Sequence, residues 1–219
     1  MVCGKYCVKV FNKNHKLSSF MTSKQWNQLN QLWSNSKLMQ TIITEQKTTC
    51  FLAGEKLPSE VDSLWLITSG VVKTYSHNKG GKPITLGFWG SKDVVGNSLS
   101  QVDFYNTKCL SDVKAIAVYR SQWANLSREM VYCQQQTQQL IYIVRNARVT
   151  KRLWLLLTWL SSKFGRVTPR GKVIDFKLTH QELADALGTT RITVTKILNQ
   201  YEREGLIVRP KTKCIIIKN

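Results

Sequence analysis

The chain has 219 residues and a formal net charge of +19, because its 32 lysines and arginines outnumber its 13 aspartates and glutamates. A hydrophobic content of 42% is sufficient for buried cores in one large or two small domains. The positive charge favours a polyanionic partner, most commonly a nucleic acid, and residues 145–219 carry +11 of it. No apolar run is long enough to span a bilayer and the N-terminus has no signal-peptide pattern, so we expect no membrane partner.

The N-terminal part of the chain is expected to be an arm followed by a short helix. Residues 1–20 are basic and polar, which is typical of a loosely ordered arm. A short helix is predicted from Thr22 to about Gln40, because four large apolar residues fall on one helical face: Trp26, Leu29, Leu32 and Trp33.

Between residues 48 and 119, short β-rich runs alternate with glycine-containing turns. Strands this short and this regularly spaced predict an antiparallel barrel or sandwich. The predicted strands are Thr49–Leu52, Leu64–Thr68, Val71–Tyr75, Ile84–Phe88 and Lys114–Tyr119.

A long helix is predicted from Gln122 to about Arg148, a stretch without glycine or proline. Seven of its residues recur at alternating spacings of three and four over three heptads, which is typical of a coiled-coil seam. We therefore expect a homodimer through this seam; the alternative is one amphipathic helix packed on its own barrel. The seam residues are Leu126, Met130, Cys133, Thr137, Leu140, Val144 and Ala147.

A hinge is expected at Asn146–Thr150, before a second helix from Lys151 to Phe164 that Gly165 ends. A loop is expected at Arg166–Lys172, and Val173–Phe176 is predicted to form a short strand.

Residues 179–201 predict two short helices that meet at a tight turn. Thr179 and Glu182 have capping-box spacing, so Thr179 is expected to begin the first helix. Gly188 occupies the turn, where a positive φ angle costs glycine little, and Thr190 is suited to cap the second helix. The expected buried faces consist of Leu183, Ala184 and Leu187 on the first helix and Val194, Ile197, Leu198 and Tyr201 on the second.

The opposite face of the second helix carries side chains that suit contacts with DNA base edges. They are Arg191, Ile192, Thr195, Lys196 and Asn199. This pattern is typical of a helix-turn-helix whose second helix enters the major groove. The alternative is an ordinary helical hairpin with a solvated basic face.

The C-terminal residues predict a wing, which is a pair of strands joined by a basic tip. The strands are expected at Leu206–Val208 and Cys214–Ile217. Lys211 and Lys213 in the tip suit contacts with phosphates, which position a protein on DNA without reading its sequence.

The order of these parts resembles the CRP/FNR family of bacterial transcription regulators over nearly the whole chain. The barrel matches through Gly54-Glu55, Leu64–Lys73 and Asp93–Gly96. The most specific match is GTTRITVTKIL at Gly188–Leu198, which looks very like the recognition helix of the cyanobacterial nitrogen-control (NtcA-type) branch. Phe176–Gln181 also matches that branch. The lysine- and asparagine-rich composition fits its red-algal plastid-encoded counterpart (Ycf28).

This resemblance implies an α+β chain with three parts. Residues 1–120 are expected to hold the arm, the short helix and an antiparallel β-barrel of the cyclic-nucleotide-binding jelly-roll type. Residues 121–149 are expected to form the dimerisation helix and hinge, and residues 150–219 a winged helix-turn-helix. A plastid-encoded member would lie in the chloroplast stroma, and any other member in the cytoplasm.

The resemblance also implies how DNA is read. Arg191 would donate two hydrogen bonds to a guanine in each half-site, and Ile192 would face a thymine methyl group. A homodimer would bind palindromic double-stranded DNA with half-sites about 34 Å apart, with RNA polymerase as a further partner. The expected DNA-contacting residues are Thr179, His180, Gln181, Thr189, Thr190, Arg191, Ile192, Thr193, Thr195, Lys196, Lys211 and Lys213.

The effector is less clearly implied than the DNA contacts. Gly96 is followed by asparagine where the cAMP-binding branch has glutamate, and no arginine lies between Val72 and Tyr119 to neutralise a cyclic phosphate. The nitrogen-control branch implies 2-oxoglutarate as effector. That branch uses an arginine and a glutamate on the long helix, but the corresponding positions here fall near Cys133 and Gln138, which carry no charge. An altered ligand, or none, is the equal alternative. The expected effector segment, whose backbone can form an anion nest, is Val95, Gly96, Asn97 and Ser98.

Two further binding functions are compatible with parts of the sequence. A protein that coats DNA without sequence preference would have the same charge; a regulator differs by preferring its site over random DNA by at least ~10³-fold. An iron–sulfur sensor of the FNR type would need Cys3, Cys7 and either Cys109 or Cys133, but the C-x2-C spacing is absent. Reduced intracellular thiols are the simpler interpretation of these cysteines.

Catalysis has little support in the sequence. The three histidines, His15, His77 and His180, are far apart in sequence and do not suggest a metal-dependent barrel enzyme. Paired carboxylates, a nucleophile elbow and a phosphate-binding loop are not recognisable either. We therefore expect no enzyme activity and no metal site.

Overall fold

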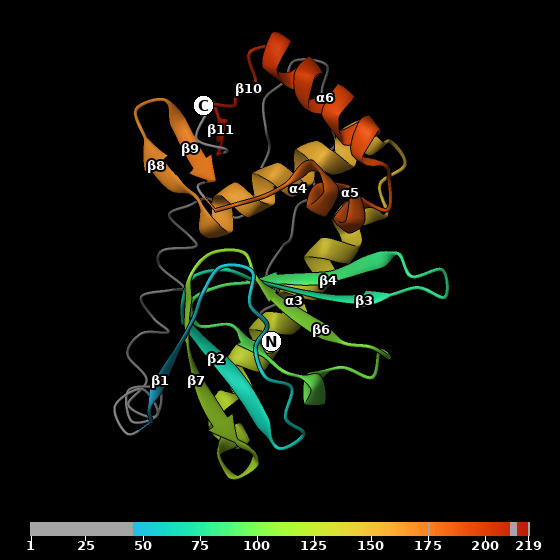
Figure 1. Ribbon diagram of the computed structural model, residues 1–219. Helices are drawn as coiled ribbons and strands as arrows, with labels where there is room; N and C mark the ends of the chain where they lie inside the picture. The colour runs from blue at the N-terminus through green and yellow to red at the C-terminus, as the bar shows by residue number, and fades with distance from the viewer. Residues whose placement is uncertain (1–45, 175, 211–213, 219) are drawn as a thin grey trace, which may run out of the picture. The chain divides into compact units, whose positions relative to one another are not determined.

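The computed structural model describes residues 46–174, 176–210 and 214–218 (Figure 1). The arm predicted at residues 1–20 and the helix predicted at Thr22–Gln40 lie outside this range. The fold class is α+β as predicted, with N-terminal β-sheets, a long helix and a C-terminal helix-turn-helix beside a small sheet. None of the described helices is long and apolar enough to cross a membrane.

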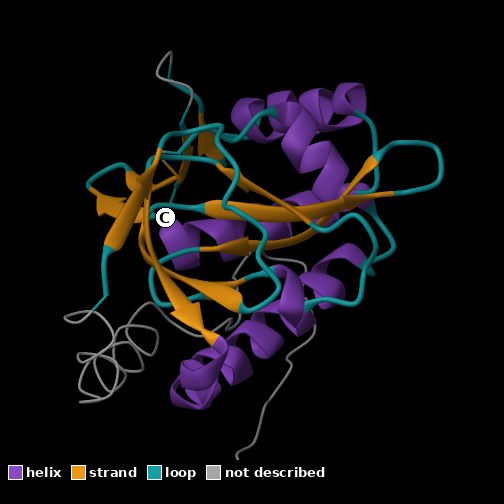
Figure 2. Ribbon diagram, turned by 60° about the horizontal axis from the view of Figure 1, so that its bottom comes forward, coloured by secondary structure: helices purple, strands orange, loops and turns teal. Residues whose placement is uncertain are grey.

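Two antiparallel sheets, orange in Figure 2, form the N-terminal part. One has the strand order β1-β7-β2-β5 and the other β4-β3-β6. All five strands predicted in this region are confirmed to within two residues at each end. The strands are β1 (Thr48–Phe51), β2 (Ser63–Ser69), β3 (Val72–His77), β4 (Pro83–Trp89), β5 (Val94–Val95), β6 (Asn106–Cys109) and β7 (Val113–Tyr119).

Strands β5 and β6 were not predicted, because neither has a local strand signal. Strand β5 is two residues long, and β6 is a polar sequence without apolar alternation. Each is fixed by its neighbour instead: Val95 pairs with Trp65 of β2, and Thr107 pairs with Thr74 of β3. The short 3-10 helix η1 (Asn97–Leu99) follows β5.

The core of the N-terminal part is built around β2, which lies between β7 and β5. Residues 63–67 of this strand are all buried, whereas an exposed sheet face would leave every second residue in water. Phe51 and Trp65 meet edge to face with ring centroids 5.2 Å apart. Each large apolar side chain buried here contributes about 1.5–3 kcal/mol to folding.

The long helix begins later than predicted. A 3-10 helix, η2 (Arg120–Leu126), precedes α3 (Ser127–Val144), whereas the sequence predicted one helix from Gln122. Two contacts tie this segment to the end of β7: Leu126 is fully buried in the core, and Trp123 Nε1 donates to the Val118 carbonyl over 3.1 Å. The break between α3 and α4 (Val149–Phe164) lies at residues 145–148, overlapping the predicted hinge.

The C-terminal part has a four-stranded sheet with the order β10-β11-β9-β8. Strands β8 (Arg166–Thr168) and β9 (Gly171–Ile174) form a hairpin, so the prediction of a loop at Arg166–Lys172 was wrong. The turn is closed by the Thr168 hydroxyl, which donates to the Gly171 carbonyl over 2.7 Å. The predicted strand at Val173–Phe176 is thus the end of β9 and stops at Ile174.

The two strands of the predicted wing are confirmed. Strand β10 (Ile207–Val208) pairs with β11 (Ile215–Ile217), and β11 also pairs with β9. The wing is therefore continuous with the hairpin that precedes the helix-turn-helix. Residues 211–213 of the tip lie outside the described part of the chain.

Two glycines with positive φ angles should differ sharply in their tolerance of alanine. Gly171 has a φ of 124°, and a Cβ there would lie 2.0 Å from the Ile217 carbonyl oxygen; Gly188 has a φ of 61° with no atom within 4 Å of a Cβ. We expect Gly171→Ala to cost about 3 kcal/mol, because overpacking adds to backbone strain. Gly188→Ala should cost about 1–2 kcal/mol from strain alone. Urea unfolding of both variants tests this, and equal losses would contradict it.

Candidate nucleic-acid interface

The first helix of the helix-turn-helix, α5 (His180–Leu187), begins and ends as predicted. The Thr179 hydroxyl accepts from the Glu182 amide over 3.1 Å, and Glu182 Oε2 accepts from the Thr179 amide over 3.0 Å. This is a complete capping box. Gly188 ends the helix in the left-handed conformation and turns the chain toward α6 (Arg191–Arg203).

Helix α6 buries the face that was predicted to be buried. Thr190 caps it by accepting from the Thr193 amide over 3.1 Å. Its buried side chains are Val194, Ile197, Leu198 and Tyr201. Tyr201 anchors the helix on α4, because its hydroxyl donates to the Thr150 carbonyl and its ring meets Trp154 edge to face.

The opposite face of α6 is open to solvent. Arg191, Lys196 and Asn199 are exposed, and Ile192 is 69% exposed. An exposed isoleucine beside cations gains from contact with an apolar group such as a thymine methyl. This face therefore has the chemistry of a base-reading surface.

Two polar side chains of this face are already engaged within the protein. The Thr195 hydroxyl donates to the Arg191 carbonyl over 2.9 Å and lies 2.8 Å from His180 Nδ1. Asn199 Oδ1 accepts from Arg209 over 2.6 Å. Both side chains thus stiffen the surface. Burial, together with the charges of Arg209 and Arg191, lowers the pKa of His180, which is therefore neutral at pH 7.

The other predicted DNA contacts lie around the helix ends. Thr179, Gln181 and Thr190 are exposed, and Thr189 is half-buried. The Gln181 side-chain amide donates a hydrogen bond to Asp185 Oδ1 over 2.7 Å. Lys211 and Lys213 lie outside the described residues, so the structure neither supports nor opposes their predicted phosphate contacts.

The capping carboxylate Glu182 is also held by the N-terminal sheets, a contact that no sequence signal indicated. Lys108 Nζ of β6 lies 2.9 Å from Glu182 Oε1, and Lys73 Nζ of β3 lies 3.9 Å from the same oxygen. Burial raises the Glu182 pKa, but hydrogen bonds from Thr179 and Lys108 and the two lysine charges outweigh it and lower the pKa below its usual value. The carboxylate is therefore ionised near pH 7.

The Glu182 site predicts how the free energy of unfolding depends on pH. Because the Glu182 pKa is lower in the folded state than in the unfolded state, its stabilising contribution is present above pH ~4.5 and is lost as the pH falls below that value. Glu182→Gln should cost about 2–3 kcal/mol at pH 7, less than for a fully buried pair because the Lys108 side chain is 42% exposed.

The loss should shrink as the pH is lowered below ~4.5, because wild type then loses the same interaction. Chemical unfolding at several pH values measures it. Glu204→Gln, which removes an exposed carboxylate of the same type, should leave the pH profile unchanged. A Glu182→Gln profile parallel to that of wild type would show that the carboxylate contributes nothing through its charge.

The residues of α3 that face outward are not those of the predicted seam. Leu126, Cys133 and Leu140 are buried within their own chain, and Leu126 and Cys133 belong to the core of the N-terminal part. Within one chain these residues therefore follow the alternative of a helix packed on its own barrel, and their part in a dimer contact stays a prediction. Met130, Thr137 and Val144 are half-buried, and Ala147 lies beyond the helix. The exposed apolar residues of α3 are Val131, Ile141 and Tyr142.

A pocket of about 190 Å³ lies beside the predicted effector segment. Gly96 and Asn97 line it, whereas Val95 and Ser98 do not. Sequence reasoning missed Lys56, which lines the pocket and donates to Asn106 Oδ1 over 3.2 Å. Burial raises the pKa of Tyr105, another lining residue, to about 12, so its hydroxyl stays protonated. The pocket therefore offers one cation and one phenol to a ligand.

Cys109 and Cys133 are buried free thiols in the described part of the chain. Burial raises the pKa of Cys109 to about 11 and that of Cys133 to about 12, so both stay protonated at pH 7. Among the described residues, no group of three histidine, cysteine or acidic side chains could hold a metal ion. Cys3 and Cys7 lie outside them.

Comparison with known proteins places the chain in a family. Residues 147–219 match the model of the Crp-like helix-turn-helix domain. The regulatory protein CysR of Synechococcus elongatus is 34% identical over 166 residues, which cover 74% of this chain and 79% of CysR. The chain belongs to the CRP/FNR family of transcription regulators. It is therefore a DNA-binding regulator and not an enzyme.

Other CRP/FNR relatives are more distant over comparable lengths. The global nitrogen regulator of Synechocystis is 28% identical over 203 residues, covering 84% of this chain and 88% of that protein. The putative regulator ycf28 of Porphyra purpurea is 26% identical over 168 residues, covering 70% of each. The identity to CysR exceeds both, so these comparisons establish the CRP/FNR family but not the nitrogen-control branch.

The fold agrees with this membership. A CRP-family transcriptional regulator from Thermus thermophilus aligns with a TM-score of 0.67 at 19% identity, covering 78% of this chain and 92% of that one. A second regulator from the same organism, titled as CRP/FNR family, aligns with a TM-score of 0.65 at 23% identity over 79% and 94% of the two chains. Regulators of the CRP family bind DNA as homodimers.

Proposed function

We propose that this chain is a homodimeric, sequence-specific regulator whose α6 reads palindromic double-stranded DNA. The observation that carries the proposal is the solvent-exposed row of Arg191, Ile192 and Lys196 on a helix whose opposite face is fully buried. Capping at Thr190 and the Tyr201 anchor hold this row on a rigid element, and precise base contacts require such rigidity.

Each exposed group of α6 has a distinct role in this proposal. Arg191 donates two hydrogen bonds to a guanine, Ile192 packs on a thymine methyl, and Lys196 neutralises a phosphate or contacts a base edge. Thr179 and Gln181, at the start of α5, lie at a helix N-terminus where a phosphate is favourably bound. Two such surfaces, about 34 Å apart in a dimer, fit half-sites separated by one helical turn.

The dimer contact that we propose uses the outward face of α3. Val131 is 59% exposed, Ile141 53% and Tyr142 52%. Residues 131 and 142 are about three turns apart and nearly in line along the helix, and residue 141 lies about 80–100° around the helix from them, so the three fall within a stripe about 100° wide. Large apolar side chains that recur along a solvent-facing helix mark an interface. Because members of the family form homodimers, we assign this interface to a second copy of the chain.

Control of nitrogen-related genes, with 2-oxoglutarate as effector and RNA polymerase as partner, is the finer form of this proposal. It is supported by 27–28% identity to two global nitrogen regulators over most of the chain. The pocket beside Gly96 offers Lys56 as a cation for one carboxylate. A plastid location is supported by the similarity to ycf28, and a cytoplasmic one by that to CysR.

Selection from a pool of randomised duplexes tests the proposal without assuming a target. We expect enrichment of a palindrome, with an affinity at least ~10³-fold above that for a scrambled duplex at the same salt concentration. Enrichment without symmetry would contradict the dimeric interpretation, and no enrichment would leave a protein that coats DNA without sequence preference. Fluorescence anisotropy on a GTA-N8-TAC duplex, with and without 2-oxoglutarate, then tests the nitrogen-control form.

A further inference from the structure

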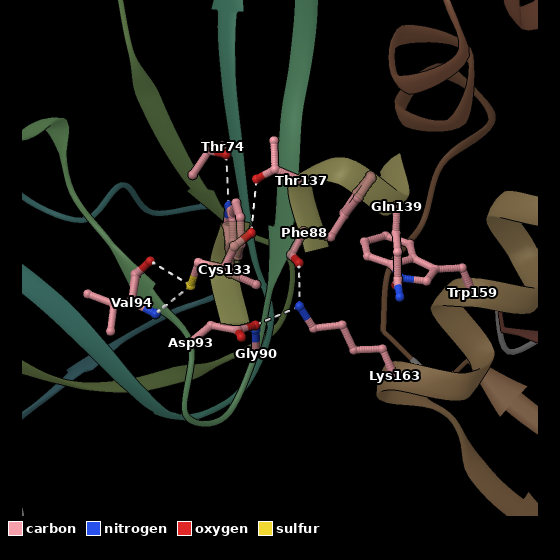
Figure 3. A network of polar contacts seen from close by, with 11 residues as sticks. Thr74, Phe88, Gly90, Asp93, Val94, Cys133, Thr137, Gln139, Trp159 and Lys163 are labelled. Atoms are coloured by element: carbon pink, nitrogen blue, oxygen red, sulfur yellow. Dashed lines mark hydrogen bonds and ion pairs between the residues drawn. The ribbon is translucent and has the colours of Figure 1, made fainter. Parts of the chain in front are cut away.

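A lysine of α4 is buried against the N-terminal sheets. Lys163, in the last turn of the helix, places its Nζ 2.7 Å from Asp93 Oδ2 and donates to the Phe88 carbonyl over 3.0 Å (Figure 3). The Lys163 side chain is 6% exposed and that of Asp93 is 0% exposed. A charge of the DNA-binding half is thus neutralised inside the N-terminal half, although the residues are 70 positions apart.

Aromatic rings complete the surroundings of this ammonium group. Its Nζ lies 5.2–5.8 Å from the ring centroids of Trp89, Tyr132, Trp159 and Phe164. These distances are typical of cation–π contacts, which strengthen when water is excluded. The rings come from β4, α3 and α4, so the socket exists only when all three elements are docked together. We call this group, with Asp93 and the Phe88 carbonyl, the Lys163 socket.

The Lys163 socket is poorly explained as a stabilising device. Asp93 Oδ2 accepts from both Lys163 and the Gly90 amide, but Oδ1 is buried without a hydrogen-bond partner in the structure. Buried ion pairs are often no more stabilising than apolar residues of the same volume, because both charges lose their hydration. What such a pair does provide is a single docking geometry for α4. Only one orientation of the helix pairs Lys163 with Asp93, and any other would leave a charge without its partner.

Two further contacts also hold α4 and α5 against the elements that precede them in the chain. Trp159 Nε1 of α4 donates to Gln139 Oε1 of α3 over 2.7 Å, as Figure 3 shows from close by. Glu182 of α5 is paired with Lys108 and Lys73 of the sheets. Neither contact involves the exposed face of α6, so the docked helix-turn-helix keeps Arg191 and Ile192 open to solvent.

We propose that Lys163 is a positioning residue: its socket holds the helix-turn-helix in one orientation and thereby sets the distance between the two recognition helices of the dimer. This inference rests on the proposed function, because a fixed distance matters only to a dimer that reads two half-sites. Docking in advance of DNA binding lowers the ordering cost of binding a correctly spaced site and penalises every other spacing.

The test compares Lys163→Met, which keeps the length and apolar stem of the side chain, with Lys114→Met, which removes the same charge from an exposed site on β7. The first readout needs no DNA. Trypsin should cut the linker at Arg145 and Arg148 at least about fivefold faster in Lys163→Met, because an undocked helix-turn-helix exposes it more often. Lys114→Met should be cut at the wild-type rate. Equal cutting of the wild type and Lys163→Met overturns the inference.

The second readout is affinity for the selected palindrome and for versions with the spacer changed by two base pairs. Wild type and Lys114→Met should prefer the native spacing, and Lys163→Met should lose at least about tenfold of that preference while binding a single half-site within about twofold of wild type. An unchanged preference overturns the inference. A wild type that has no preference, with linker cutting still raised in Lys163→Met, means that the proposed function fails and the socket stands.

If Lys163→Met does not fold, Asp93→Asn serves in its place. The amide oxygen still accepts from Gly90, and the Phe88 carbonyl still holds Lys163, so only the charge is removed. The same two readouts should move in the same direction by a smaller factor. If both readouts match those of wild type, the ion pair does not position the helix-turn-helix.

Discussion

Replacing Arg191 with alanine is expected to lower affinity for the selected palindrome by about 2–6 kcal/mol, since each of two half-sites loses about 1–3 kcal/mol. That corresponds to roughly 30-fold to 10⁴-fold in Kd. Affinity for scrambled DNA should change far less, because only one of many positive charges is lost. The ratio of the two affinities, measured by anisotropy at fixed salt, is therefore the informative quantity.

Arg203→Ala is the matched control for Arg191→Ala. It removes the same exposed guanidinium from the same helix, but three turns away. We expect it to weaken specific and scrambled DNA equally and only slightly. If Arg191→Ala behaves in the same way, Arg191 contacts phosphate and the base-reading role is wrong. Arg191→Lys separates charge from geometry, because lysine cannot reproduce the planar two-donor fork.

The helix-turn-helix could be predicted closely because its signals are local. The Thr179–Glu182 capping box, the left-handed Gly188 and the Thr190 cap each depend on residues within four positions. The buried face of α6 follows from helical spacing alone. Every one of these features was predicted, and each is present in the structure.

Contacts between distant segments could not be predicted in this way. Glu182 was recognised as a capping residue, but its second oxygen is paired with lysines more than 70 positions earlier in the chain. The Asp93–Lys163 pair joins two residues that look like ordinary surface charges in the sequence. Strand β5 is two residues long and exists only through its pairing with β2. Periodicity carries no information about partners of this kind.

The long helix shows that a correct period does not say what the marked face packs against. The spacing of Leu126, Cys133 and Leu140 correctly marked an apolar face, but that face packs on the N-terminal core. The exposed Val131 and Tyr142 lie on the opposite side, where neighbouring glutamines hide the apolar spacing. A helix that serves both a core and a dimer needs two seams, and the stronger one belongs to the core.

This argument makes the outward face of α3 the second decisive test. The double variant Val131→Glu with Ile141→Glu should raise the dimer dissociation constant at least about 100-fold, or about 2.7 kcal/mol, because buried carboxylates would face their symmetry mates. Analytical ultracentrifugation measures this directly. Affinity for the palindrome should fall with it, while binding of a single half-site should persist.

Two controls distinguish the outward face of α3 from its buried face. Val61→Glu, at a valine of the N-terminal part that is 73% exposed, should leave association unchanged. Leu140→Ala, in the seam that the sequence favoured, should lower the free energy of unfolding by about 2–5 kcal/mol and leave the dimer dissociation constant near that of wild type. If Leu140→Ala dissociates a folded dimer and the glutamate pair does not, the buried seam must open to make the contact. The docking of α3 on the N-terminal core would then be the conformation of the monomer.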